Sequence, residues 1–118
     1  MAQSYIQPDE LDVALPSMDW QVLKNLRNAG DSRKAKREID HFFTRGAPGG
    51  ADQAALIEAL RQIDGMRKLV KGRGRSVQAV VFADTTAQSI ARQINAFEAL
   101  ARKHGYLYDG WGTSFVAE

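Results

Sequence analysis

The two histidines of the chain are the residues whose side chains could do acid–base or metal chemistry near neutral pH. A catalytic centre needs a nucleophile or a second acid–base group within hydrogen-bond reach. Asp40 precedes His41, but neighbouring residues of a strand point to opposite faces, so Asp40 cannot orient His41 locally. His104 lies where a helix is expected to end, and a protonated imidazole interacts favourably with the last carbonyls there. We therefore predict no catalytic residues, with His41 in the core or on a sheet face.

The sequence lacks the residue patterns that usually form metal and cofactor sites. The chain has no cysteine, which excludes disulfides, thiolate zinc sites and iron–sulfur clusters. The histidines do not have the spacing of a HExxH zinc motif, and the glycines at 65, 72 and 74 form neither GxGxxG between a strand and a helix nor GxxxxGK[ST]. We expect no metal and no cofactor, and we predict that the protein is not an enzyme.

A basic segment is the next candidate for a binding function. Within nine positions the chain carries five cations and no acidic residue: Arg67, Lys68, Lys71, Arg73 and Arg75. The run Gly-Arg-Gly-Arg within it is typical of a hairpin connection with a cationic tip. Such a tip could contact nucleic-acid phosphates or an acidic partner, although charge runs most often form only a solvated face. Of the aromatic residues that an RNA-binding sheet needs, the central strands offer only His41, Phe42 and Phe43.

Length and composition indicate one globular domain. A chain of 118 residues can bury a single core, and 44% hydrophobic with 25% charged residues is typical of soluble proteins. The N-terminus lacks the basic start and apolar run of a signal peptide, and no window approaches the roughly 18 apolar residues of a membrane helix. We expect a cytoplasmic protein with no membrane contact.

The elements follow from periodicity and from capping residues. Residues 1–16 carry two prolines and no clean period, so we predict an N-terminal arm before a single domain over 17–118. Helices are predicted from Ser17, as N-cap, to Gly30; from Asp52 to Gly65; and from a cap at Asp84, Thr85 or Thr86 to His104. Strands are predicted over 66–71 and 76–83, on either side of the hairpin connection, and from Tyr106 onward.

The segment AKREIDHFFT over 35–44 is compatible with two structures. Ala35, Ile39, Phe42 and Phe43 suit one face of a helix, whereas Ile39, His41 and Phe43 suit one face of a strand. Its density of aromatic residues and the break that follows at GAPGG favour a strand. The order after the first helix is then βαββαβ, which predicts an α+β ferredoxin-like sandwich with an additional N-terminal helix. In that fold the segments 35–44 and 76–83 are central, and the strand from Tyr106 lies at an edge.

The C-terminal run YDGWGTSF, after a helix that ends in LARKHG, is the most specific motif of the chain. It resembles the end of the domain in the regulator of ribonuclease E activity B (RraB) family. The segment REIDHFF resembles that family's first strand, where an acidic residue precedes a His-aromatic pair. The resemblance extends from about Trp20 to Val116. The residues that match the family's motifs are His41, Tyr108, Asp109, Gly110, Trp111, Gly112 and Thr113.

The resemblance implies a ferredoxin-like, non-enzymatic protein that binds ribonuclease E, or another degradosome component, and restrains RNA cleavage. It leaves homo-oligomerisation open. The inhibitors of the family carry an acid-rich tail after the motif, whereas this chain has a net charge of +2, which implies weaker attraction to a basic scaffold. A small RNA-binding module that uses residues 67–75 is the alternative.

The motif DGWGT also has a physical interpretation of its own. Gly110 and Gly112 flank Trp111, so the strand can bend or bulge while the indole packs inward, and Asp109 and Thr113 can bind the freed amides. This favours a structural role. The alternative is a contact patch for a partner on an edge strand, built from Tyr106, Tyr108 and Trp111.

Overall fold

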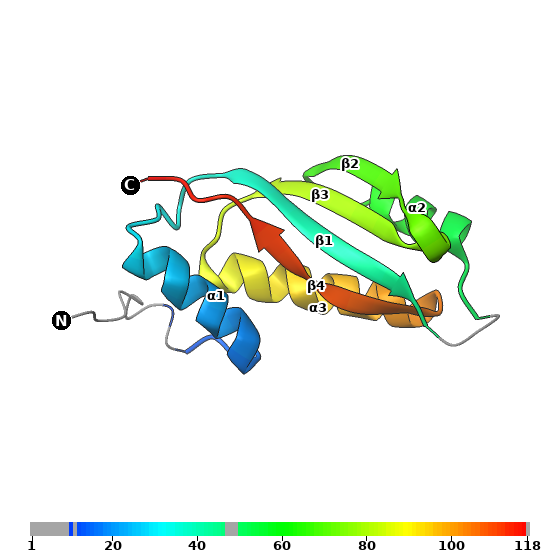
Figure 1. Ribbon diagram of the computed structural model, residues 1–118, viewed down its shortest axis with the longest axis horizontal. Helices are drawn as coiled ribbons and strands as arrows, with labels where there is room; N and C mark the ends of the chain where they lie inside the picture. The colour runs from blue at the N-terminus through cyan, green and yellow to red at the C-terminus, as the bar shows by residue number, and fades with distance from the viewer. Residues whose placement is uncertain (1–9, 11, 47–49, 118) are drawn as a thin grey trace.

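The computed structural model describes residues 10, 12–46 and 50–117. The described part of the chain forms three α-helices and four strands, and their arrangement is shown in Figure 1. Their order is α1 (Ser17–Asn28), β1 (Arg37–Arg45), α2 (Gln53–Arg61), β2 (Met66–Lys71), β3 (Val77–Ala83), α3 (Ala87–Lys103) and β4 (Tyr106–Thr113), with a short 3₁₀ turn, η2 (Arg73–Arg75), between β2 and β3.

The strands form one antiparallel sheet in the order β2-β3-β1-β4. This arrangement confirms the predicted α+β ferredoxin-like sandwich, with β1 and β3 in the centre and β4 at an edge. The ambiguous segment is a strand, as predicted. Its burial alternates, with Ile39, His41 and Phe43 buried and Glu38 and Phe42 exposed, which is the period of a strand with one covered face.

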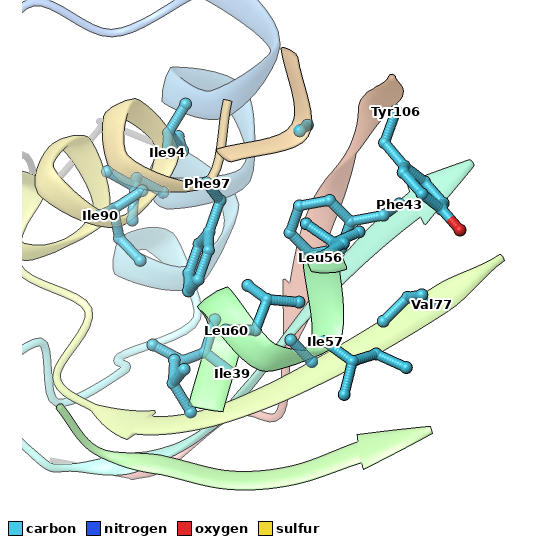
Figure 2. Packing of buried hydrophobic residues seen from close by; sticks show 14 of the residues in the cluster. Ile39, Phe43, Leu56, Ile57, Leu60, Val77, Ile90, Ile94, Phe97 and Tyr106 are labelled. Atoms are coloured by element: carbon cyan, nitrogen blue, oxygen red, sulfur yellow. The ribbon is translucent and has the colours of Figure 1, made fainter. Parts of the chain in front are cut away.

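The core lies between one face of the sheet and the helices. In Figure 1, α1 and α3 lie on the same side of the sheet. Figure 2 shows Ile39, Phe43 and Val77 of the strands pointing toward Leu60 of α2 and Phe97 of α3. Phe97 stacks edge-on against Phe43, with ring centroids 5.9 Å apart. The helices thus close one face of the sheet, and nothing in the described chain covers the other face in the same way.

The expected caps are present except at two helix ends: the start of α1, and the end of α2, which is at Arg61 with Gln62 as C-cap and not at the predicted Gly65. The carboxylate of Asp52 accepts the amide of Ala55, and the hydroxyl of Thr86 accepts the amide of Ser89. Gly30, just beyond α1, has φ +87°, the left-handed conformation expected of a helix stop. The predicted N-cap Ser17 is wrong, because Pro16 occupies that position and Ser17 is the first residue of the helix. Pro16 has no capping side chain, but its carbonyl accepts the amides of Asp19 and Trp20.

A buried group of charges joins segments that are distant in the sequence. Arg27 of α1 donates to Glu10 at 2.9 Å, and Arg37 of β1 donates to Asp31 at 2.5 Å. Asp31 also accepts the amide of Val116 at 2.7 Å. Each carboxylate is fully buried and is paired with two cations, Glu10 with Arg27 and Arg33, and Asp31 with Arg27 and Arg37. The predicted arm is therefore fixed to the domain at Glu10, while positions 1–9 and 11 of the arm lie outside the described residues.

Candidate partner-binding site

His41 lies at the centre of a buried hydrogen-bonded chain. It is 0% exposed. Its Nε2 is 2.8 Å from Oε1 of Gln93, and its Nδ1 is 2.7 Å from the hydroxyl of Tyr108. The amide nitrogen of Gln93 in turn donates to Ser89 at 2.9 Å. An amide oxygen only accepts, so Nε2 of His41 carries the hydrogen and Nδ1 accepts from Tyr108.

The same environment keeps His41 and Tyr108 neutral. Burial lowers the pKa of His41 to about 4, because the hydrogen bond that His41 donates to Gln93 and the charge of Asp40 only partly offset desolvation. Burial also raises the pKa of the Tyr108 phenol well above its usual range. Asp40 lies on the opposite face of β1, where its carboxylate accepts from Gln78 at 3.1 Å. An uncharged His–Tyr pair without an orienting carboxylate fits the role of a polar contact between α3 and the sheet.

A β-bulge in β4 places the aromatic residues of the motif on one face. His41 pairs with Trp111, and Phe43 pairs with Tyr108, so three steps along β4 match two steps along β1. The extra residue falls at Asp109 and Gly110, and Gly110 has φ +104°, which favours glycine. Residues three apart on a regular strand face opposite ways. The bulge therefore directs both Tyr108 and Trp111 toward the helices.

Trp111 connects the edge strand to the additional helix. Its indole nitrogen donates to the carboxylate of Asp19 in α1 at 2.8 Å, and its ring packs, partly buried, against the core. The hydroxyl of Thr113 donates to the carbonyl of Glu38 at 2.9 Å. The partner that the structure gives the Thr113 hydroxyl is thus a carbonyl and not one of the freed amides of the bend. Asp109 is exposed, and its carboxylate makes no hydrogen bond within residues 10, 12–46 and 50–117.

The basic residues do not gather into one patch. The hairpin connection between β2 and β3 is present as predicted, with Arg73 and Arg75 at its tip and Arg67 and Lys68 toward the far end of β2. All of these residues and Lys71 are exposed. The guanidinium of Arg67 lies over the ring of Phe82, 4.5 Å from its centroid, which anchors it on the open sheet face.

The aromatic residues that could stack RNA bases are divided between the two faces. His41 and Phe43 are buried beneath the helices, so only Phe42 of the three candidates reaches the open face, where it is 39% exposed. Phe82 of β3 is 37% exposed on that face. Phe82, Gln93 and Asp19 are the contact residues that the sequence analysis missed. Gln93 could have been found from its i, i+4 spacing to Ser89, because both border the apolar stripe of α3.

The described residues form neither a metal site nor a membrane-spanning helix. Among them, no group of three or more histidine, cysteine, aspartate or glutamate side chains lies close enough to hold a metal ion. None of the helices in that part of the chain has the length and apolar character needed to cross a bilayer.

The fold and the site together define an α+β ferredoxin-like domain with one closed and one open sheet face. Comparison with protein families identifies the group more narrowly. The family model RraB, regulator of ribonuclease activity B, matches residues 17–113, from the first residue of α1 to the last of β4. The chain belongs to this family. Comparison with curated proteins finds no match to the chain.

Proposed function

We propose that the protein is a non-enzymatic regulator that restrains a ribonuclease by binding to it, with ribonuclease E or another degradosome component as the partner in the cytoplasm. The observation that carries this proposal is the match to the ribonuclease-regulator family over residues 17–113. That match includes every helix and strand of the described chain. We therefore assign the proposed regulatory function to the domain as a whole and not to one segment of it.

The surroundings of His41 support a role without catalysis. The imidazole is buried and bonded on both nitrogens, and its pKa of about 4 leaves it neutral near pH 7. A general base must reach the proton that it abstracts, and His41 has no exposed edge from which to do so. Regulation by binding uses a surface instead, and the open sheet face supplies one.

The direct experiment measures cleavage of an RNA by purified ribonuclease E with increasing amounts of the full chain. The proposal predicts that the cleavage rate falls with protein concentration and levels off when the nuclease is saturated. The two proteins should also co-elute in size-exclusion chromatography. An unchanged cleavage rate together with separate elution would contradict the proposal that ribonuclease E is the partner.

RNA binding through the basic residues is the alternative. It is favoured by the exposure of Arg73 and Arg75 at the hairpin tip. Filter binding to RNA across a salt series tests it, because binding driven by phosphate contacts weakens steeply as salt rises. The double variant Arg73→Glu with Arg75→Glu should then abolish retention. This function would be excluded if the filter retained no RNA, or if the amount of RNA retained did not change with salt or with the two substitutions.

A further inference from the structure

The open face of the sheet has two halves of opposite charge. Arg67 and Lys68 lie on the β2 half. Glu38 and Asp40 lie on β1, and the exposed Asp109 lies at the bulge of β4. The apolar ring of Phe42 is partly exposed between these acids. A segment that binds over β1 and β4 thus meets carboxylates around an aromatic ring.

Gly112 has no role within the fold that requires glycine. A glycine is needed where φ is positive or where a Cβ atom would collide with a neighbour. Gly112 has neither reason: its φ is not in the left-handed region, and a Cβ built on it meets nothing within 4 Å. Each of the other glycines compared in this way has a positive φ, a close neighbour or both: Gly30, Gly46, Gly65, Gly72, Gly74, Gly105 and Gly110.

The open space at Gly112 is on the open face of the sheet. Gly112 pairs with Asp40, which faces away from the helices, so a side chain at 112 would project beside Asp40. Gly110, at the bulge opposite Phe42, also has open space where its Cβ would be. The open face of β4 is consequently bare backbone at Gly110 and Gly112, between Thr113 and the exposed Asp109. A glycine inside a strand weakens it, and it often marks a place where another backbone or a ligand comes close.

We propose that the open face at Gly112 is the partner-binding surface, and that it takes an extended, basic segment of a partner protein. An apolar or aromatic side chain of that segment would lie on the bare strand at Gly110 and Gly112, against Phe42. Its lysine or arginine residues would pair with Glu38, Asp40 and Asp109. The inference refines the protein-binding function proposed above by naming the surface and the chemistry of the partner.

Charge decides between a basic peptide and the other candidate occupants. The carboxylates of Glu38, Asp40 and Asp109 repel RNA phosphates at this half of the sheet. A second copy of the chain in a two-fold arrangement would bring the same acids against one another, since such an interface uses the same patch on both subunits. A basic segment is attracted by all of them. The net charge of +2 predicts weak attraction to a basic scaffold. Net charge is an average over the chain, and it does not describe the acidic residues that lie together on this half of the sheet.

Selection from a displayed library of random peptides tests the surface without any nuclease. The bait is the full chain, and each peptide has about 12 residues, enough to cross the sheet when extended. We expect the selected peptides to be basic and to contain an aromatic or large apolar residue. Gly112→Val should weaken their binding at least about tenfold, which is a hot-spot effect. Ala99→Leu, which adds an exposed apolar group to α3, is the matched control and should not.

The outcomes separate this inference from the proposed function. A library that yields no binder, or yields acidic binders, or binders insensitive to Gly112→Val, would overturn the inference whatever ribonuclease E does. If size-exclusion chromatography shows a dimer that Gly112→Val converts to a monomer, the occupant is a second copy and the basic partner is wrong. Failure to bind ribonuclease E, with basic peptides still selected at Gly112, would instead reject only the nuclease.

Discussion

The two faces of β4 differ in their contacts with the rest of the domain. On the closed face, Tyr108 and Trp111 are each tied to another element: Tyr108 to His41 of β1, and Trp111 to Asp19 of α1. On the open face, Gly110 and Gly112 present backbone with nothing near their Cβ positions. Residues 108–112 therefore have one side in contact with the core and one side open. The bulge at Gly110 decides which side chains face the core.

This difference separates the structural part of the motif from the part available to a partner. We propose that the aromatic residues of DGWGT stabilise the domain and that its second glycine serves binding. Substitutions on the closed face should then change the free energy of unfolding, whereas those at Gly112 should change affinity. The predictions below test this division, beginning with the largest effect.

Trp111→Ala should lower the free energy of unfolding by about 3 kcal/mol, at the lower end of the range for Trp-to-Ala changes because the indole is only partly buried. Chemical denaturation of the variant beside the wild type measures the loss. Asp19→Ala is the control for the hydrogen bond alone and should cost about 1 kcal/mol. An unchanged midpoint for Trp111→Ala would mean that the ring belongs to a contact surface.

The stability should fall on acidification because the core holds His41 in its neutral form. The unfolded imidazole takes up a proton near pH 6.5, but the folded one does so only near pH 4. Its stabilising contribution is therefore complete above pH 6.5 and is lost as the pH falls toward 4. Between pH 6.5 and 5 the loss is about 1–2 kcal/mol by linkage.

Urea unfolding at several pH values, for the wild type and for His41→Asn, isolates this contribution. The variant keeps polar atoms at the site but cannot titrate, so its stability should fall less between pH 6.5 and 5. Carboxylates elsewhere affect both proteins alike and cancel in the comparison. Parallel curves for the two proteins would show that His41 is not the group responsible.

The two glycines of the motif should respond oppositely to alanine. Gly110→Ala places a side chain at φ +104° and should destabilise the domain by about 1–3 kcal/mol. Gly112→Ala should stabilise it by about 0.5–1 kcal/mol, since glycine in a strand costs backbone entropy. Thermal unfolding of the pair measures both signs. A clear loss of stability in Gly112→Ala would mean that the fold itself requires this glycine.

The sequence was sufficient for the architecture because periodicity and capping residues are local signals. The aromatic density and the following GAPGG break, which favour a strand over 35–44, and the cap at Asp52 could be recognised without tertiary information. The contacts of the site could not be predicted in the same way. The pairing of Trp111 with Asp19 joins positions 92 residues apart, and the face on which Phe82 lies depends on the sheet order. Of the two helix ends that were predicted wrongly, the one at Ser17 has a local cause, because Pro16 occupies the N-cap position.

The central claim is that the open face at Gly112 binds the partner. The most direct measurement is the inhibition of ribonuclease E cleavage by the wild type, Gly112→Val and Ala99→Leu, after thermal unfolding has shown that all three have the same midpoint. The account predicts that the wild type and Ala99→Leu slow cleavage equally, and that Gly112→Val needs at least about ten times more protein for the same effect, equivalent to about 1.4 kcal/mol of binding. A Gly112→Val chain as potent as the wild type, or a wild type without effect, would contradict it.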